Sequence, residues 1–432
     1  MPKRLDSSSS SFTDDFAEFL SSKRDTEDAA DQTAKEIVQK VIDEGDAALF
    51  AFTEQFDRFN VDASTICISA DEMSAALDVT PSDQRNALEL AAARIRAYHE
   101  LQRPADLQYR DADGVSLGMR WTPVDSVGVY VPGGTAAYPS SVLMNVMPAR
   151  VAGVERIAMA VPTPGGKINP LVLAAAHIAG VDEVYRIGGA QAVAALAYGT
   201  ESVQAVDKIV GPGNAYVAAA KRIVFGKVGI DTIAGPSEVV IVAERGQASA
   251  EWLAADLLAQ AEHDPAAQSI LISDDGALLE ETAKAVETTL KTLARGEIAE
   301  ASWRDHGALI KVEDIDAAIP IVNAIAPEHL QLVLENCNEF ALRVRHAGAI
   351  FLGPYTPEAI GDYVGGPNHV LPTSGSARFS SGLSLFDFLK RTTLLGCDAT
   401  TVTKLGPAAT TLAQAEGLDA HALSVALRLD RL

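Results

Sequence analysis

Apolar residues recur at helical spacing in two early stretches of the chain. Asp31 to Phe56 and Ser82 to Gln102 place apolar side chains three or four residues apart, as amphipathic helices do. Between residues 114 and 131 the pattern changes to alternation, which is typical of a half-buried strand. The first hundred residues therefore predict a helical segment that precedes the first strand of a sheet.

From about residue 155, short apolar strands alternate with helical stretches. The first run predicts strands at 156–161, 183–187 and 208–210, with helices through 171–178, from 191 and from 214. The second run predicts strands at 238–242, 269–272, 308–310 and 349–352, with helices in most of the gaps. Strands separated by helices at this spacing indicate βαβ units, so we expect an α/β fold with two Rossmann-like parallel-sheet domains.

These patterns divide the chain into four parts. A helical N-terminal segment (1–110) precedes the first Rossmann-like domain (111–235), and the second domain follows (236–385). A small helical tail with Ala and Leu periodicity ends the chain (386–432). An old duplication would explain two successive runs of the same kind, although no residue-level repeat supports it.

Composition narrows the class of protein. Of 432 residues, 48% are apolar and the net charge is −23, so nucleic acid and anionic membrane surfaces are poor partners. The three cysteines are far apart in sequence, which favours a reducing compartment over a disulfide framework. The first residues lack the apolar core of a secretory signal, and no apolar run approaches the roughly 20 residues of a membrane span. We therefore expect a globular cytoplasmic enzyme.

Three glycine-rich turns each follow an expected strand and precede an expected helix. They are Val131-Pro132-Gly133-Gly134, Gly188-Gly189-Ala190-Gln191 and Gly211-Pro212-Gly213-Asn214. Ligands of open α/β sheets bind at such strand ends, where helix N-termini suit phosphates. None of the turns matches Gly-x-Gly-x-x-Gly, so each is also consistent with an ordinary tight turn. Three turns on one sheet edge favour a nucleotide bound in a non-standard way.

Two polar pairs lie in otherwise apolar surroundings. Gln260 and His263 are three residues apart on an expected helix without Gly or Pro, so their side chains would share a face. A solvated helix end is the alternative for this pair. Glu328 and His329 stand among apolar residues, where an ionisable pair is costly unless it is used or solvated. A capping Glu beside a surface His is the alternative there.

Further polar residues complete a possible metal site. Asp362 lies in a glycine-dense segment, and Glu416 and His421 lie in the tail; a turn and an exposed helix end are their respective alternatives. Two imidazoles, one carboxylate and one amide oxygen suit zinc. With a single negative ligand, bound zinc keeps a positive charge and can polarise an alcohol or aldehyde oxygen. The donors in question are Gln260, His263, Asp362 and His421.

In these residues the chain resembles the histidinol dehydrogenases, from about Asp31 to the C-terminus. The segments that carry the resemblance are 128–134, 188–192, 210–214, 234–238, 260–263, 326–329, 365–369 and the tail around His421. The resemblance implies NAD-dependent and zinc-dependent oxidation of L-histidinol to L-histidine through L-histidinal, the last steps of histidine biosynthesis. It also implies a homodimer whose C-terminal tail is exchanged between subunits, so that the tail completes the partner's site.

The resemblance also implies a role for each site residue. Glu328 and His329 would be the acid/base residues: His329 would take the alcohol proton, and Glu328 would activate water. The 111–235 domain would be the NAD side, and the 236–385 domain would be the metal and acid/base side. The implied ligands of one zinc ion per subunit are Gln260, His263, Asp362 and His421. The implied NAD contacts are Tyr130, Gln191 and Asn214. The implied substrate contacts are Ser237, Gln260, His263, His329, Asp362, Glu416 and His421.

Other functions fit part of this pattern. None of the three cysteines lies in a glycine-rich loop, so water activated by Glu328 is a better expectation than a thiohemiacetal. A zinc/NAD dehydrogenase of another small polar alcohol is the main alternative, and the Glu416–His421 tail favours an amino-alcohol with a basic ring. A zinc hydrolase would not need the glycine-rich turns. A non-catalytic binding module would not need every expected site residue.

Overall fold

The computed structural model describes residues 2–21, 28–133, 138–233 and 235–430. The chain divides into a larger unit (Met1–Leu101 with Asp125–Asp387) and a smaller unit (Gln102–Val124 with Phe388–Leu432). The larger unit holds two parallel α/β sheets, which confirms the expected fold class. Two residues of the quoted glycine-rich segments, Gly134 and Ala234, lie outside the described residues.

The first sheet has the strand order β2-β7-β6-β5-β8-β9. Its strands are β2 (Cys67–Ile68), β5 (Ser126–Tyr130), β6 (Arg156–Ala160), β7 (Glu183–Tyr185), β8 (Lys208–Val210) and β9 (Gly229–Ile230). The pairs β5–β6, β6–β7, β5–β8 and β8–β9 are parallel, and β2 runs antiparallel to β7. The expected strands near 156–161, 183–187 and 208–210 are confirmed.

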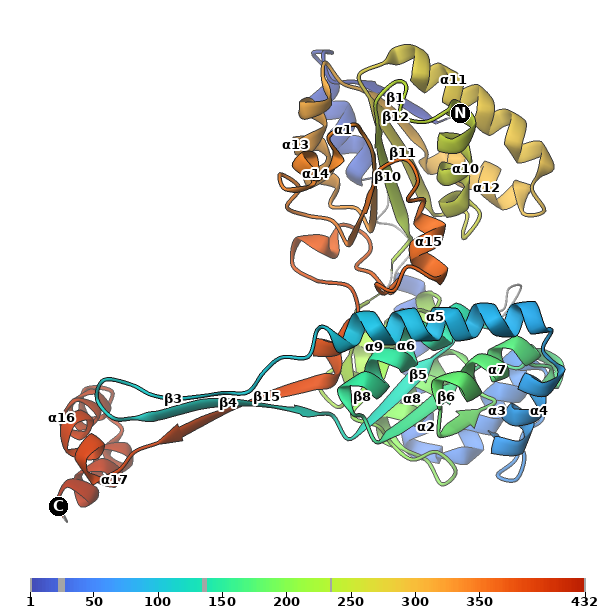
Figure 1. Cartoon of the computed structure of the whole chain (residues 1–432). Helices are drawn as coiled ribbons and strands as arrows, with labels where there is room; N and C mark the ends of the chain where they lie inside the picture. The colour runs from blue at the N-terminus through green and yellow to red at the C-terminus, as the bar shows by residue number, and fades with distance from the viewer. Residues whose placement is uncertain (1, 22–27, 134–137, 234, 431–432) are drawn as a thin grey trace. The chain divides into compact units, whose positions relative to one another are not determined.

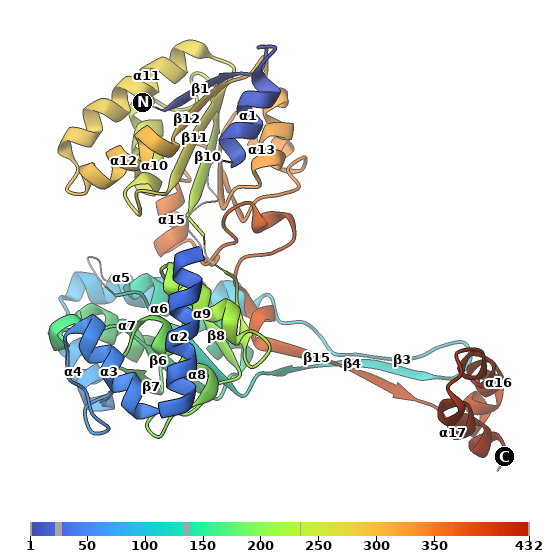
Figure 2. The same cartoon turned by 180° about the vertical axis from the view of Figure 1, so that it is seen from behind.

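Helices cover both faces of this sheet. Figure 1 shows α5, α6 and α7 on one face, and Figure 2 shows α2, α8 and α9 on the other. A buried cluster packs Ile37 and Val41 of α2 against alanines of α8 and α9. The expected helix over 31–56 is two helices, because the chain turns at Gly45, whose φ is 58°. The helices are α2 (Asp28–Glu44), α3 (Asp46–Asp57), α4 (Ala70–Val79), α5 (Ser82–Glu100), α6 (Pro139–Ala152), η1 (Pro164–Gly166), α7 (Pro170–Ala179), α8 (Gly189–Tyr198) and α9 (Ala215–Val224).

The second sheet has the order β1-β12-β11-β10-β13-β14, and its neighbouring strands are parallel. Its strands are β1 (Lys3–Asp6), β10 (Glu238–Ala243), β11 (Gln268–Ser273), β12 (Ala308–Lys311), β13 (His329–Val333) and β14 (Ala349–Leu352). Alternate residues of β10 enter different cores. Val239 and Ile241 pack with α10, α11 and α12, whereas Val240 and Val242 pack with α1 and α13 (Figure 1). Both faces of the sheet are therefore buried, as expected for parallel strands.

The helices around this sheet vary in length. The longer ones are α1 (Phe12–Ser21), α10 (Ala250–Ala261), α11 (Gly276–Thr289), α12 (Gly296–His306) and α13 (Ala318–Ile325). The shorter ones are η2 (Leu290–Thr292), η3 (Ile315–Ala317), α14 (Cys337–Ala341), α15 (Glu358–Tyr363), η4 (Ser376–Arg378) and η5 (Leu385–Phe388). Within the described ranges, no helix is both long and apolar enough to cross a membrane.

Two strands of the second sheet are absent from the sequence prediction. β1 comes from a stretch expected to be helical, and it pairs in parallel with β12 at the sheet edge. β13 lies between β10 and the edge strand β14, so it is an interior strand of the sheet. Its first residue, His329, and the preceding Glu328 interrupt the apolar pattern by which we identified the other strands.

The smaller unit is an antiparallel sheet and a helix pair. The sheet has the order β15-β4-β3, with β3 (Leu107–Arg110), β4 (Ser116–Pro123) and β15 (Leu389–Gly396). α16 (Ala399–Ala415) packs on α17 (Asp419–Leu429), which confirms the expected helical tail. The alternating stretch 114–131 is two strands that belong to different sheets, β4 and β5.

Candidate active site

Polar residues of the second sheet gather at the edge where its strands begin. Ser237 precedes β10, Glu328 precedes β13, and His329 is the first residue of β13. Parallel strands begin at the same edge, and the register pairs Val239 with His329. Gln260 lies in the last turn of α10, which leads into β11 at this edge. The glycine-rich turns of the first sheet, in contrast, lie at the C-terminal ends of its strands.

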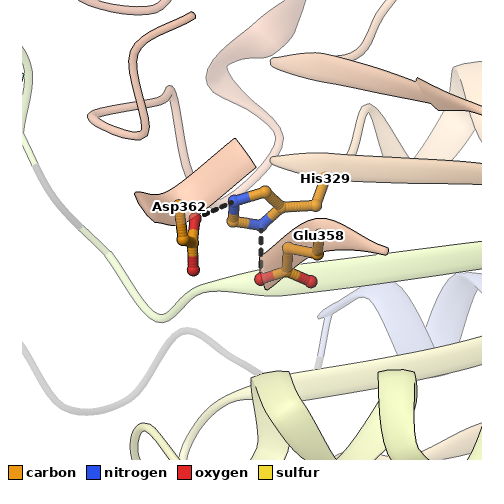
Figure 3. A group of neighbouring side chains, drawn as sticks. All are labelled: His329, Glu358 and Asp362. Atoms are coloured by element: carbon orange, nitrogen blue, oxygen red, sulfur yellow. Dashed lines mark ion pairs between the residues drawn. The ribbon is translucent and has the colours of Figure 1, made fainter. Parts of the chain in front are cut away.

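His329 is buried between two carboxylates that approach different ring nitrogens (Figure 3). Its Nδ1 lies 3.5 Å from Glu358 Oε1, and its Nε2 lies 4.0 Å from Asp362 Oδ1. Glu358 and Asp362 are four residues apart on α15, so one short helix presents both groups. Burial lowers the pKa of His329 to about 3, although the Glu238 carbonyl, 3.3 Å from Nδ1, opposes this shift. The imidazole is therefore neutral and able to accept a proton.

Glu328 is the second buried proton-transfer group. Its carboxylate accepts hydrogen bonds from the Glu238 N–H, at 3.3 Å, and from the Ser237 hydroxyl. Burial raises the pKa of Glu328 well above its ordinary value; the negative charges of Glu238 and Asp362 add to this, and the hydrogen bonds oppose it. Glu328 Oε2 lies 3.8 Å from His329 Nδ1. A carboxyl group in this setting takes up or releases a proton as the charge around it changes.

Glu358 belongs to the same cluster, and the sequence analysis missed it. Burial raises its pKa well above the ordinary value, and repulsion from Asp362 and Glu328 raises it further. Burial also raises the pKa of Asp362, to about 6. The only sequence signal was the spacing of four between Glu358 and Asp362. Pro357 and Gly361 hide the helical pattern there.

The donors of the cluster fit a bound cation. His329, Glu358 and Asp362 offer ligand atoms that all lie within 4.8 Å of one another. Asp362 is also one of the ligands expected from the sequence. Among the described residues, buried atoms without a hydrogen-bond partner include Gln260 Oε1, His329 Nε2 and Glu358 Oε2. Buried acceptors that lack donors, beside closely spaced carboxylates, suit a metal ion.

His263, another expected ligand, is not among these buried donors. α10 ends at Ala261, so His263 lies just beyond the helix, where it is exposed and its N–H donates to Gln260 O at 3.2 Å. Burial lowers the pKa of His263, and repulsion between the two imidazoles in their protonated forms contributes to the lowered pKa of His329. Glu416 and His421 are exposed residues of the smaller unit, at the end of α16 and in α17.

Hydrogen bonds fix the segment that follows Asp362. The Asp362 carbonyl oxygen lies 3.0 Å from His369 Nδ1, and Asn368 Nδ2 donates to Met144 O of α6 at 2.6 Å. Arg94 of α5 donates to the carbonyl oxygens of Val364, at 2.5 Å, and Gly365, at 3.1 Å. These bonds hold the chain on both sides of the turn, which limits the positions open to the Asp362 carboxylate.

Comparison with known proteins identifies the family. The chain matches the family described as histidinol dehydrogenase over residues 20–429. It is 59% identical to the histidinol dehydrogenase of Rhodospirillum rubrum, over 100% of this chain and 99% of that protein. It is 57% identical to that of Gluconobacter oxydans, over 99% of this chain and 100% of that protein. The crystal structure of the Elizabethkingia anophelis histidinol dehydrogenase superposes with a TM-score of 0.94 at 35% identity, covering 100% of this chain and 98% of that one.

The chain belongs to the histidinol dehydrogenase family. It is therefore an NAD-dependent oxidoreductase that acts on a primary alcohol in histidine biosynthesis. Its fold is also similar to that of aldehyde dehydrogenase 21 from Physcomitrella patens, with a TM-score of 0.51 at 10% identity, over 89% of this chain and 90% of that one. That likeness concerns the fold alone.

The three residues expected at the NAD side of this family member differ in exposure. Tyr130 is buried, its hydroxyl accepts the Gly189 N–H at 3.0 Å, and burial raises its pKa to about 12. Gln191 is buried in the first turn of α8. Asn214 is exposed, and its side-chain oxygen caps α9 by accepting two backbone N–H groups. The Tyr130 hydroxyl thus holds the Gly188-Gly189 turn, Gln191 is buried in the helix that follows it, and Asn214 is exposed.

Proposed function

We propose that this enzyme oxidises L-histidinol to L-histidine through L-histidinal, reducing one NAD in each of two steps. The observation that carries the proposal is the buried pair Glu328 and His329, whose pKa values are shifted in opposite directions. A neutral imidazole beside a carboxyl group of raised pKa provides two proton-transfer groups with different tasks. Full oxidation of an alcohol needs both, because the aldehyde must be hydrated before the second hydride can leave.

His329 serves the alcohol step. Its Nε2, which has no hydrogen-bond partner among the described residues, would accept the hydroxyl proton as hydride leaves the adjacent carbon. The Glu238 carbonyl and the Glu358 carboxyl group both lie near Nδ1. A proton on Nδ1 would be held by these two oxygens, which leaves Nε2 as the acceptor.

Glu328 serves the aldehyde step. Its carboxylate would remove a proton from water as the water oxygen adds to the aldehyde carbon. The resulting hydrate then loses a proton and a hydride to give the acid. Ser237 and the Glu238 N–H would hold the Glu328 side chain in place during this transfer. We assign no covalent role to cysteine, because Cys67, Cys337 and Cys397 lie outside the cluster described above.

We assign NAD to the glycine-rich turns at the strand ends of the first sheet. The N-termini of α8 and α9 suit the pyrophosphate, because unpaired backbone N–H groups and the helix dipole favour negative charge there. Asn214 would contact NAD directly, being exposed at the start of α9. Tyr130 and Gln191, which lie beside the Gly188-Gly189 turn, would also contact NAD.

We assign one zinc ion per subunit to Gln260, His263, Asp362 and the tail residue His421. When bound, the ion polarises the alcohol or aldehyde oxygen and offsets the negative charge of the buried carboxylates. Gln260 Oε1 is buried and has no hydrogen-bond partner in the part of the chain that the structure describes, which supports its inclusion. The proposed substrate contacts are Ser237, Gln260, His263, His329, Asp362, Glu416 and His421.

We propose further that the enzyme is a cytoplasmic homodimer in which the tail reaches the partner's site. The smaller unit supports this, because a three-stranded sheet and two helices build little core of their own. It leaves several large apolar side chains exposed, which a second subunit would cover. They include Leu395, Leu405, Leu412, Leu423 and Leu427.

The proposal is tested by following NADH formation from L-histidinol before chelation, after chelation and after zinc is restored. We expect chelation to abolish turnover, zinc to restore it, and histidine to form with two NADH per substrate. NAD binding without turnover of histidinol would move the substrate to another small polar alcohol, which a panel of alcohols would identify. Turnover that survives complete metal removal would contradict the zinc assignment.

A further inference from the structure

A buried ion pair contacts the third glycine-rich turn, Gly211–Asn214. This pair is separate from the acid/base cluster. Lys221 lies on α9, and Asp231 directly follows β9, the edge strand beside β8. Their side chains form an ion pair and are 3% and 2% exposed. Most other ion pairs in the described residues are at least partly exposed, for example Arg156 with Glu183 at 18% and 30%.

Both members of the pair bind the same glycine. Lys221 Nζ donates to the Gly211 carbonyl oxygen at 3.0 Å, and Asp231 Oδ2 accepts the Gly211 N–H at 2.7 Å. The two charged groups and the glycine thus form a closed ring of contacts. Gly211 is the first residue of the turn that leads through Pro212 and Gly213 to Asn214, the cap of α9.

The backbone conformation of this turn requires glycine at position 211. Gly211 has a φ of +113°, and a Cβ atom there would overlap the carbonyl oxygen of Tyr130. The Tyr130 hydroxyl in turn accepts the Gly189 N–H of the neighbouring glycine-rich turn. The Lys221–Asp231 pair therefore fixes one turn directly, and Tyr130 lies between that turn and the next.

General stability does not account for this arrangement. A buried ion pair loses its hydration, and an apolar pair of similar size is often equally stable or more so. Apolar side chains cannot replace the hydrogen bonds to Gly211, because its carbonyl oxygen needs a donor and its N–H needs an acceptor. A turn held in its binding shape before the ligand arrives avoids the cost of ordering it on binding.

We propose that Lys221 and Asp231 are positioning residues for the dinucleotide, holding the Gly211–Asn214 turn in the shape that binds NAD. This inference rests on the proposed function for the location of NAD. It predicts that the pair governs dinucleotide affinity and leaves histidinol binding and the chemical steps alone, because the acid/base cluster belongs to the other sheet.

The test replaces both members together, so that no unpaired charge is left buried. K221M/D231L removes both bonds to Gly211, and K221M/D231N keeps an acceptor for the Gly211 N–H. We expect KM for NAD to rise roughly tenfold in K221M/D231L and by less in K221M/D231N, since small misplacements of binding groups cost affinity. The KM for histidinol and kcat at saturating NAD should be unchanged. The control is R156M/E183Q, which removes a half-buried ion pair where the strands of the same sheet begin.

Direct titration with NADH, followed by fluorescence, separates this inference from the proposed function. Weaker NADH binding by folded K221M/D231L, with normal binding by R156M/E183Q, supports the inference whether or not histidinol is the substrate. Unchanged NADH affinity in K221M/D231L and in K221M/D231N overturns the inference. A loss of kcat and of thermal stability in these two variants, without any change in KM for NAD, also overturns it. Failure of the unaltered enzyme to oxidise histidinol while it still binds NADH would overturn only the proposed substrate.

Discussion

The Nδ1 atom of His329 lies 3.5 Å from the carboxyl group of Glu358. The two residues come from β13, an interior strand, and from α15, a short helix that follows β14 in the chain. Both are buried, so their interaction is little screened by water. We propose that this contact orients the imidazole, a role for Glu358 that its position in the sequence did not indicate.

Replacing Glu358 with Gln should therefore slow the reaction without weakening NAD binding. The amide keeps the shape of the side chain but can present a donor to Nδ1, which favours the wrong tautomer of His329. We expect kcat to fall by roughly 10²-fold, the order of a general-base contribution, with KM for NAD unchanged. The matched control is E339Q, the same change at an exposed residue of α14, which should behave like the unaltered enzyme. Equal kcat values for E358Q and the unaltered enzyme would remove Glu358 from the site.

The substitution E328Q should separate the two oxidation steps. The alcohol step should be largely retained, because His329 takes that proton, whereas hydration of the aldehyde should slow by roughly 10²-fold. NADH formation is measured separately from L-histidinol and from L-histidinal. Equal losses in both assays would show that Glu328 does not have the separate role assigned to it.

The metal ligands should be distinguishable by zinc content. D362N should lose most of the bound zinc after dialysis, because it removes the only carboxylate of the proposed ligand set. E358Q should retain zinc, although Glu358 and Asp362 both lie beside His329. Because Asp362 belongs to both donor sets, elemental analysis of E358Q and of H263N decides between the proposed set and the alternative donors His329, Glu358 and Asp362. Zinc loss in E358Q with retention in H263N would favour the alternative donors.

Exchange of the tail can be tested by mixing two inactive variants. H421N is defective in the tail, and E328Q is defective in the larger unit, so neither should form histidine efficiently. If the tail serves the partner's site, each mixed dimer has one site free of both substitutions, and about a quarter of all sites should regain activity after random reassembly. Pairing H421N with a second tail variant, E416Q, is the control and should restore nothing. Absence of recovery in the first mixture, with mixed dimers demonstrated by a tag, would mean that each tail serves its own subunit.

Several features were predictable from the sequence because they depend on local chemistry. The alternation of apolar strands and helices predicted both parallel sheets, since periodicity reports which side chains are buried. The three glycine-rich turns and the pair Glu328 and His329 could also be recognised from the sequence as candidate binding and catalytic residues. A costly ionisable pair among apolar residues is visible without knowledge of its neighbours.

Other features depended on contacts between residues far apart in the chain. β13 was missed because its first residue is His329, and only pairing with β10 and β14 makes it an interior strand. β4 and β5 read as one alternating stretch, yet they pair in different sheets. The partnership of Glu358 with His329 arises only when α15 packs against the start of β13. The types of element and the reactive residue types follow from local spacing, so they could be predicted from the amino-acid sequence. Which carboxylate meets which imidazole nitrogen depends on strand order and helix packing across the whole sheet, so it emerges only in the folded molecule.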